Sequence, residues 1–545
     1  MKIDDFYSNI SKSEFYLGII SQVFRSGSYL QVENLSLLQY RKIYDERLLP
    51  NTINYYVVID DIQGLFFGEI YQSRVQNTSM VREAIREEKY DSVFPELAIN
   101  IIGIMKNERF ELPGFKTVGV NDKVYVANKE LIRRYMKSLP VHQYFKHAKM
   151  EHSQLTISGF ANFSKFNNVG FEVQPNVIFD RHLMVVGTTN SGKSTSSLAI
   201  LDKMIDSKKK MLIIDPTGEY RDAFQDENVK RLKLGENVHL SVGKVANQQW
   251  EMLFQINGNT QGAVLAEAIE SLRYQKSHQN SGVYKKDGRV VQDVQRELME
   301  LQDTDTDFDL KQLARQINED SVEIYKQGNI EKYRLQVFRE NTNEWLVKKV
   351  KHELNNTTFL NFFTNQGCGS DLLQQIDEFL LNSDESLYID ASNIGTTDGV
   401  GTMIIDLICN YIINRDKDDI RPFVLFVDEV HRYTRFVDSE NESLSGLTSI
   451  AREGRKKGVF LFLTTQSPND VPKILLGQIG TLIIHRLTGK DELEAIHNYL
   501  DEDAIKQVRG LNKGEAVLTS INLLQDVYLK FIKSKRIHHN ETPVL

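Results

Sequence analysis

Residues 183–195 read Leu183-Met184-Val185-Val186-Gly187-Thr188-Thr189-Asn190-Ser191-Gly192-Lys193-Ser194-Thr195. The order is a short apolar strand, a loop that matches G-x-x-x-x-G-K-[ST] at every fixed position, and the start of a helix. In that geometry the backbone N–H groups of residues 187–195 cradle phosphate oxygens, and the helix dipole adds its positive end. Lys193 would reach the β- and γ-phosphates, and the Ser194 hydroxyl would be a ligand of Mg²⁺. The stretch predicts a nucleoside triphosphate site, with a chance loop as the alternative.

The length and composition predict a multidomain globular protein. At 545 residues the chain has room for about two to four domains, and its 41% hydrophobic and 26% charged residues are ordinary values. No run approaches the roughly 18 apolar residues of a membrane span, and the acidic start lacks the apolar region of a signal peptide. The two cysteines, Cys368 and Cys409, have no metal-ligand spacing. These features predict a reducing, cytoplasmic setting without a membrane.

The net charge of −8 bears on the choice of partner. It argues against an extensive surface for nucleic acid, but it leaves room for a local basic channel. Short basic clusters occur within 208–210, 285–289, 348–351 and 452–457. Such clusters are more often solvated faces than sets of phosphate contacts.

Changes of pattern divide the chain into four parts. Residues 1–150 hold short strand-like runs between turns, which favour a small β-barrel or sandwich. Residues 151–261 and 386–525 alternate strands with helices, which predicts a parallel sheet. The polar stretch 262–385 is interpreted as a helical insertion, and 526–545 as a C-terminal tail. Apolar residues recur at helical spacing in the insertion, as in Leu310, Leu313, Ile317 and Ile324. The predicted fold class is α/β, a RecA-like P-loop parallel sheet core with an N-terminal small β-barrel and a helical insertion.

A second apolar run, Phe423–Val427, ends in two carboxylates, Asp428 and Glu429. A buried parallel strand presents such acids at its carboxyl end, where ligands bind in open α/β sheets. Asp428 would hold Mg²⁺ through water, and Glu429 would polarise the water that attacks the γ-phosphate. A strand that ends in Asp-Glu is a weak signal alone, but it becomes strong after a phosphate loop in the same chain.

Polar residues follow three further predicted strands. Gln466 comes after the run 459–463 and would sense the γ-phosphate or hold the attacking water; its alternative is to cap the loop that follows. Asp390 either supports a ligand residue or only forms a turn. Glu219 faces the nucleotide, a neighbouring subunit or solvent.

Phosphoryl transfer also needs cations that stabilise charge on the equatorial oxygens. Arg181 lies just before the strand that leads into the phosphate loop. Arg452 and Arg455 lie at the end of a helix-like segment, where arginines also stabilise a helix dipole. If the chain forms a ring, these three are candidates for reaching a neighbour's nucleotide.

Taken together, these residues resemble the HerA family within the HerA/FtsK group of P-loop ATPases. The matching segments follow the family's order and rough spacing, and they are Gly187–Ser194, Asp215–Tyr220, Tyr388–Ser392, Val427–Arg432, Ala451–Gly458 and Thr465–Pro468. The first 150 residues resemble the small barrel of that family (HAS-barrel-like) by pattern rather than by motif. The helical insertion also has a counterpart.

The resemblance implies a homo-hexameric ring with ATP and Mg²⁺ bound between subunits, in a family whose members pump double-stranded DNA through the pore. It puts Arg181 where the family has an arginine ahead of the phosphate loop. It puts Arg452 and Arg455 in the segment that supplies the arginine acting in trans, without deciding between them. The tail, 526–545, resembles a segment that packs on the adjacent subunit, with a disordered basic end as the alternative.

The resemblance also implies a separate effector protein docked on the face of the N-terminal barrel. In relatives this effector is a nuclease in DNA end processing, or a sirtuin-like NADase or another nuclease in anti-phage defence. The sequence shows no nuclease or NADase constellation of its own. The favoured hypothesis is a DNA-translocating motor. The alternative is an assembly platform whose ATPase regulates the effector without translocating DNA, and a protein-remodelling or secretion-coupling ATPase is a third.

Overall fold

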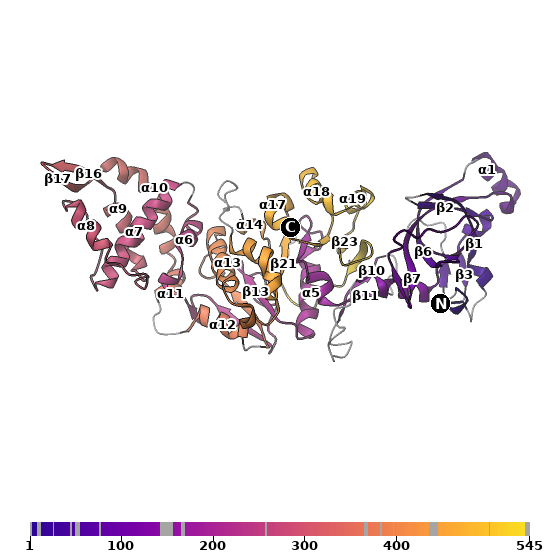
Figure 1. Ribbon diagram of the computed structural model, residues 1–545, viewed down its shortest axis with the longest axis horizontal. Helices are drawn as coiled ribbons and strands as arrows, with labels where there is room; N and C mark the ends of the chain where they lie inside the picture. Colours follow the sequence, from indigo (N-terminus) through magenta and orange to yellow (C-terminus); the bar gives the residue numbers. More distant parts are fainter. Residues whose placement is uncertain are drawn as a thin grey trace, which may run out of the picture. The chain divides into compact units, whose positions relative to one another are not determined.

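The computed structural model describes residues 3–7, 12–24, 27–43, 46–48, 55–75, 78–141, 156–164, 169–256, 259–364, 369–381, 384–395, 397–434, 445–500 and 502–539. These residues form two compact units (Figure 1). Unit 1 comprises Met1–Val177 and Leu518–Leu529, and unit 2 comprises Ile178–Val517 and Lys530–Leu545. Within the described ranges no helix is long and apolar enough to cross a lipid bilayer.

Unit 1 contains a closed β-barrel of six antiparallel strands. Their order around the barrel is β2 (Gly27–Val32), β1 (Tyr16–Phe24), β9 (Lys123–Val126), β5 (Tyr56–Asp61), β6 (Gly64–Arg74) and β7 (Glu96–Lys106). Pairing of β2 with β7 closes the barrel, and β8 (Arg109–Glu111) extends β7. Along β2 every second residue is buried, as the alternation of side chains in a strand requires. The small N-terminal barrel is therefore confirmed.

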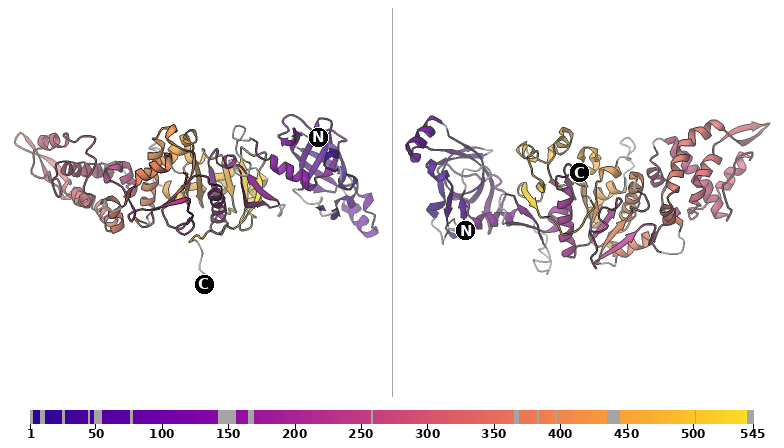
Figure 2. Two further views of the ribbon diagram at one scale, coloured as in Figure 1. Left: turned by 90° about the horizontal axis from the view of Figure 1, so that it is seen from below. Right: turned by 180° about the vertical axis from the view of Figure 1, so that it is seen from behind.

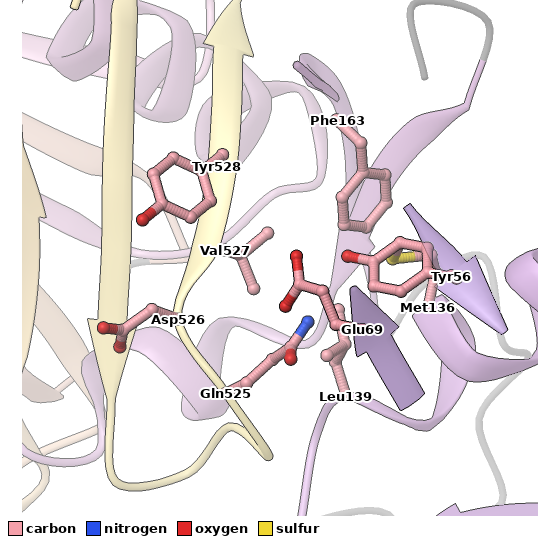
Figure 3. Close-up of a pocket in the computed structure, with 9 residues that line it drawn as sticks. All are labelled: Tyr56, Glu69, Met136, Leu139, Phe163, Gln525, Asp526, Val527 and Tyr528. Carbon is pink, nitrogen blue, oxygen red and sulfur yellow. The ribbon is translucent and has the colours of Figure 1, made fainter. Parts of the chain in front are cut away.

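Helix α2 (Lys129–Ser138) packs its apolar side against the barrel strands. Asn128 caps the helix by accepting a hydrogen bond from Leu131 N (2.9 Å), and the Tyr135 ring stacks on Phe67 with a centroid distance of 4.3 Å. A cavity of about 20 Å³ lies in the same unit, with Tyr56 and Glu69 among its walls (Figure 3). This volume suits about one water molecule, so the cavity is too small for a ligand.

The remaining elements of unit 1 are short. They are β3 (Arg41–Ile43), β4 (Glu46–Leu48), α1 (Thr78–Glu87), β10 (Ile157–Phe163) and β11 (Gly170–Val173). Three elements carry the chain across the boundary between the units, namely α4 (Pro175–Phe179), β23 (Glu515–Ser520) and β24 (Val527–Phe531).

Unit 2 is built on a parallel sheet. Its strands lie in the order β22 (Thr481–Ile484), β12 (Leu183–Val186), β21 (Val459–Thr465), β20 (Phe423–Val427), β13 (Met211–Asp215), β19 (Ser386–Asp390) and β14 (Val229–Lys233). Segments far apart in the sequence therefore lie side by side, as the mixture of colours in this unit shows (Figure 2). The central strands are buried along their whole length, because helices cover both faces. The predicted α/β core is confirmed.

Helices flank this sheet and connect its strands. They are α5 (Lys193–Asp206), α12 (Leu372–Leu381), α13 (Asp398–Ile413), α14 (His431–Thr434), α15 (Gly446–Ser449), α16 (Arg455–Lys457), α17 (Lys473–Leu476), α18 (Lys490–Ile496) and α19 (Glu502–Val508). Cys409 is fully buried in α13, as a small core residue would be. Cys368 lies outside the described residues.

The stretch predicted as a helical insertion is mostly helical. Its elements, with the preceding α6 (Asn247–Leu253), are α7 (Asn259–Ser277), α8 (Val291–Leu298), α9 (Leu313–Glu319), β16 (Val322–Gln327), β17 (Ile330–Leu335), α10 (Val337–Leu354) and α11 (Thr357–Thr364). The expected helical pattern fails at Ile324, which lies in the antiparallel hairpin β16–β17. Val322, Ile324 and Tyr325 are residues that favour strands, and Gly328 turns the chain with a φ of +67°. Strand-forming residues followed by a glycine turn were the correct signal there.

Candidate nucleotide site

The phosphate loop, residues 187–192, connects the end of β12 to the start of α5. Its two glycines have no room for a side chain. A Cβ at Gly187 would lie 2.5 Å from Ser191 Oγ, and one at Gly192 would lie 2.8 Å from the Gly514 backbone. Gly192 also has a φ of +119°, which residues with side chains rarely adopt. The glycines of the motif are therefore required by the path of the backbone itself.

A buried histidine supports the loop, although no sequence motif marked it. His485 follows β22, and its Nε2 lies 2.8 Å from Ser196 Oγ in the first turns of α5. Its Nδ1 lies 2.8 Å from Glu515 O and carries a proton, because a carbonyl can only accept. Burial, with a smaller contribution from the charge of Lys193, lowers the pKa of His485 to about 4. The ring is therefore a neutral part of the scaffold.

Asp428 and Glu429 follow β20 at the carboxyl edge of the sheet, beside the phosphate loop. Lys193 Nζ lies 3.3 Å from Glu429 Oε1, and both side chains are largely buried. Asp428 accepts hydrogen bonds from the Thr464 hydroxyl and from Tyr220 OH, the latter at 2.9 Å. The fold thus brings the predicted lysine and both predicted acids together, and it adds Tyr220 and Thr464 as partners that the sequence analysis missed.

Gln466 links Glu429 to the phosphate loop. Its Nε2 donates to Glu429 Oε1 (2.5 Å), its backbone N donates to Glu429 Oε2 (3.1 Å), and its Oε1 accepts from Thr189 Oγ1 (2.5 Å). The side chain therefore faces the site instead of capping the loop that follows it. Its role as a γ-phosphate sensor or as a holder of water stays a prediction.

Several carboxylates gather at this edge, and the pKa values respond to their proximity. Burial, followed by the charge of Glu429, raises the pKa of Asp428 to about 6. Burial, followed by the charges of Asp428, Asp215 and Glu429, raises the pKa of half-buried Glu219 to about 7. Glu219 therefore faces the acidic cluster rather than open solvent. Such an excess of negative charge favours binding of a cation.

The donor set fits Mg²⁺. Among the described residues no group of three or more His, Cys, Asp or Glu forms a complete metal site. Mg²⁺ commonly keeps several waters and takes one or two protein ligands together with substrate phosphates. The Ser194 hydroxyl at the start of α5 would be such a ligand, and the Asp428 carboxylate at the end of β20 would hold the ion through water. This assignment, predicted from the sequence, stays a prediction.

The other two strand-end aspartates form turns. Asp390 Oδ1 accepts from Ser392 N (2.9 Å) and Ser392 Oγ (2.6 Å). Asp215 accepts from the backbone N of Gly218 and of Tyr220, both at 2.8 Å. Asp390 is thus a turn former, and Asp215 shapes the turn that presents Glu219.

The three predicted arginines lie at the opposite edge of the sheet, where the parallel strands begin. The Arg181 carbonyl accepts from Gly480 N (2.6 Å), and Arg455 Nε lies 3.2 Å from Asp180 Oδ1. Arg452 is exposed on a π-helical segment, Ile450–Gly454, and its side chain makes no hydrogen bond or ion pair within the described part of the chain. About 20 Å of extended chain separates Arg181 from Gly187, so this edge lies beyond reach of the chain's own phosphate loop.

Comparison with known proteins identifies the family. The profile described as "Helicase HerA, central domain" matches residues 161–381, and the profile described as "Helicase HerA-like C-terminal" matches residues 412–521. The chain belongs to the HerA family. The resemblance seen in the sequence is thereby confirmed, and with it the class of P-loop ATPases to which HerA helicases belong.

Individual HerA relatives are distant in sequence. A probable helicase of Methanocaldococcus jannaschii is 22% identical over 358 residues, which cover 64% of this chain and 62% of the relative. A probable DNA double-strand break repair helicase HerA of the same organism is 23% identical over 395 residues, which cover 65% and 71%. The chain thus spans about three fifths of the first relative. The solved structure of VirB4 of Thermoanaerobacter pseudethanolicus is 15% identical and has a TM-score of 0.45, covering 69% of this chain and 96% of that one.

The predicted C-terminal tail of this HerA-family chain begins with strand β24, and the described residues after that strand lie against unit 2. Arg536 binds Asp202 of α5 (Nε to Oδ1, 2.6 Å) and also pairs with Asp226. The His539 N–H donates to Glu219 O (2.9 Å). Residues 540–545 lie outside the described residues, and packing of the tail on a neighbouring subunit stays a prediction.

One more cation approaches the HerA-type phosphate loop. Lys513 Nζ donates to Asn190 Oδ1 at the tip of the loop (2.6 Å), and the next residue, Gly514, donates its N–H to Ser191 O (2.9 Å). Lys513 is exposed, and its partner is a neutral amide, so its charge is available to a phosphate. No motif marks this lysine, because it lies far along the chain from every motif segment.

Proposed function

We propose that this chain is an ATP-hydrolysing motor that works as a homo-hexameric ring with Mg²⁺ and ATP bound between subunits. The observation that carries the proposal is the division of the site between two edges of one sheet. The phosphate loop, both acids and Gln466 share the carboxyl edge, whereas all three candidate arginines lie at the amino edge. A second copy that turns its amino edge toward this site would complete it, as heterologous contacts in a ring do.

In the proposed mechanism the backbone of residues 187–195 and Lys193 bind the triphosphate. Ser194 and Asp428 would hold Mg²⁺, which would supply positive charge that stabilises the triphosphate. Glu429 accepts a hydrogen bond from the attacking water and polarises it, and Gln466 keeps Glu429 and Thr189 in place around that water. An arginine from the neighbouring subunit stabilises the charge that develops on the transferred phosphoryl group.

Arg452 is the stronger candidate for the arginine that acts in trans. Arg455 already pairs with Asp180 in its own chain, so its guanidinium would have to leave that carboxylate. Arg452 is exposed and unpaired within the described residues, on a π-helical segment, and such segments occur often at functional sites. Arg181 would act beside it.

Double-stranded DNA is the proposed substrate of the motor. Two relatives bear names that describe helicases, and one name specifies DNA double-strand break repair. Contacts of lysines and arginines with phosphates would give binding with little sequence preference. The net charge of −8 favours the second candidate, a platform whose ATPase regulates a partner without moving along DNA.

An effector protein, either a nuclease or a sirtuin-like NADase, is proposed to dock on the N-terminal barrel, in DNA end processing or anti-phage defence. Two barrel loops support a docking role, because they expose large apolar side chains. Ile62 is 100% exposed and Phe115 is 104% exposed, and Gln63 beside Ile62 donates to Thr117 O (3.1 Å), so the two loops adjoin. Phe115→Asp should therefore abolish recruitment of a co-expressed effector and leave ATP hydrolysis unchanged.

The ATPase rate with and without double-stranded DNA, at low and at moderate salt, tests the motor. Stimulation by DNA that fades as salt rises is expected, because phosphate contacts release counterions. A rate that does not respond to DNA would instead support the platform. Absence of hydrolysis in the assembled ring would contradict both.

A further inference from the structure

His182 lies between Arg181 and the first residue of β12, and nothing in the proposed chemistry uses it. Its side chain is only 2% exposed. Its backbone has a φ of +57°, in the left-handed region that few residues other than glycine, asparagine, aspartate and histidine adopt. A buried polar side chain held on an uncommon backbone conformation is expected to have a specific task.

Both ring nitrogens of His182 are engaged by neighbouring segments. Nδ1 accepts the N–H of Leu461 in β21 (2.9 Å), so Nδ1 carries no proton in this arrangement. Nε2 therefore carries the proton and donates it to Ala451 O (2.9 Å). Burial lowers the pKa of His182 to about 4, which keeps the ring in this neutral form at ordinary pH.

Ala451 directly precedes Arg452 in the π-helical segment. The Ala451 carbonyl is thereby held by the residue that precedes β12, the strand that leads into the phosphate loop of the same chain. A second contact joins the same two segments, because Asp180 pairs with Arg455, the residue that follows the π-helical segment. Residues 180–182 thus contact Arg455 directly and contact the residue before Arg452 through its carbonyl.

We infer that His182 is a positioning residue that fixes the Arg452 turn of one subunit for action on the nucleotide of its neighbour. The inference rests on the proposed function, since it requires the arginine to act in trans. The hydrogen bond from Nε2 to Ala451 O fixes the backbone position just before Arg452. The hydrogen bond from Leu461 N to Nδ1 fixes the orientation of the His182 imidazole. Loss of the first bond displaces Arg452 while the phosphate loop of the same chain keeps its structure.

Two substitutions separate the two bonds. Asparagine places its amide near the position of Nδ1, so His182→Asn keeps an acceptor for Leu461 N but cannot reach Ala451 O. Glutamine places its amide near Nε2, so His182→Gln keeps a donor for Ala451. Asparagine also tolerates a positive φ, so His182→Asn should fold. We expect kcat of the His182→Asn ring to fall about 10- to 100-fold, as for a displaced catalytic group, with little change in ATP affinity. His182→Gln should lose much less.

Mixed rings test whether His182 acts across the subunit boundary. Subunits with His182→Asn keep a working phosphate loop, and subunits with Lys193→Ala keep a working arginine face. Co-assembled, they should hydrolyse ATP well above the rate of either homogeneous ring, because some interfaces pair two intact halves. The same mixture made with Arg452→Ala in place of His182→Asn is the reference.

The reference mixture of Arg452→Ala and Lys193→Ala subunits distinguishes failure of the role of His182 from failure of the trans arginine. Recovery with Arg452→Ala but not with His182→Asn would overturn the role of His182 and leave the trans arginine standing. Absence of recovery in both mixtures would overturn the trans arginine, and the role of His182 with it. Equal loss of kcat in His182→Asn and His182→Gln rings of wild-type thermal stability would also overturn the inference.

Discussion

The two edges of the sheet in unit 2 differ in how complete they are. At the carboxyl edge Glu429 contacts both Lys193 and Gln466, and all three side chains are at least partly buried. At the amino edge Arg452 stands exposed without a partner in the described chain. Groups that are already held in place need little reorganisation during the reaction. An exposed arginine without a partner can act only when another molecule brings a negative charge to it. This difference is the one that the proposed ring requires, because each chain would then contribute halves of two different sites.

The charges of the two edges are complementary. The carboxyl edge holds Asp215, Glu219, Asp428 and Glu429, and their mutual repulsion contributes to the raised pKa of Glu219. The amino edge exposes Arg181, Arg452 and Arg455 within the described residues. Attraction between them would guide one subunit onto the next and would weaken as salt rises. Assembly and catalysis would then depend on the same groups.

The largest expected effect comes from removing Arg452, the arginine at the amino edge that is proposed to act on the nucleotide of a neighbouring subunit. Arg452→Ala should lower kcat by about 10³-fold, the lower end of the range for arginine fingers, and leave ATP binding unchanged. Steady-state ATPase assays and nucleotide titration measure the two quantities. Lys456→Ala removes a nearby exposed charge and serves as the matched control. A larger loss in Arg455→Ala than in Arg452→Ala would reverse the assignment.

The next effect tests the carboxyl edge alone. Glu429→Gln keeps the shape of the side chain but removes the base, so kcat should fall by about 10²- to 10³-fold while ATP still binds. Lys193→Ala is the contrast, since it should lose nucleotide affinity instead. A normal turnover rate in Glu429→Gln would remove this residue from the role given to it.

A smaller effect is expected from the hydrogen bond that Tyr220 donates to Asp428. Tyr220→Phe removes the hydroxyl that donates to Asp428 Oδ2, which should raise the pKa of Asp428 further and weaken Mg²⁺ binding about tenfold. The Mg²⁺ concentration needed for half-maximal ATPase rate measures the change. Tyr388→Phe is the matched control, because Tyr388 OH donates to Asp215 instead (2.8 Å). An equal shift in both variants would show a general loss of packing.

The sequence was informative where chemistry depends on consecutive residues. The phosphate loop fixes its own backbone path through Gly187 and Gly192, so its motif could be read directly. Asp428 and Glu429 could be placed beside it because parallel strands end at one edge. The barrel and the parallel core followed from periodicity, since burial on one face or on both leaves different patterns.

Motifs and periodicity do not predict contacts between segments that lie far apart in the sequence. Tyr220 donates to Asp428, and His485 meets Ser196, only because the fold brings distant segments together. The hairpin containing Ile324 was missed because its few apolar residues also fit a helical period. Arg452 and Arg455 lie at the amino edge because they come just before the first residue of β21. The motif alone does not show this position.

A modest effect is expected from the lysine near the tip of the loop. Lys513→Ala removes a cation that can reach a phosphate bound beside Asn190, so affinity for ATP and for ADP should fall together, by about 3- to 10-fold, with kcat unchanged. Titration with both nucleotides measures this. Lys417→Ala is the control, because Lys417 is an exposed lysine in the short 3-10 helix Lys417–Asp419 that precedes β20. A loss confined to ATP would place Lys513 at the γ-phosphate instead.

The smallest effect concerns stability and the acidic edge. The pKa of Glu219 rises from its ordinary 4.5 to about 7, so between these values the folded chain keeps a proton that the unfolded chain has lost. Stability therefore falls as pH rises through this window and levels off above about 7. Glu219→Gln removes that loss, and its melting temperature should exceed that of the wild type by about 1–3 °C at pH 8, with little difference at pH 4.5. Asp428 remains and keeps part of the slope in both proteins. A gain that is larger at pH 4.5 than at pH 8 would mean that Glu219 is stabilised as a carboxylate, and that the acidic edge is less crowded than its geometry indicates.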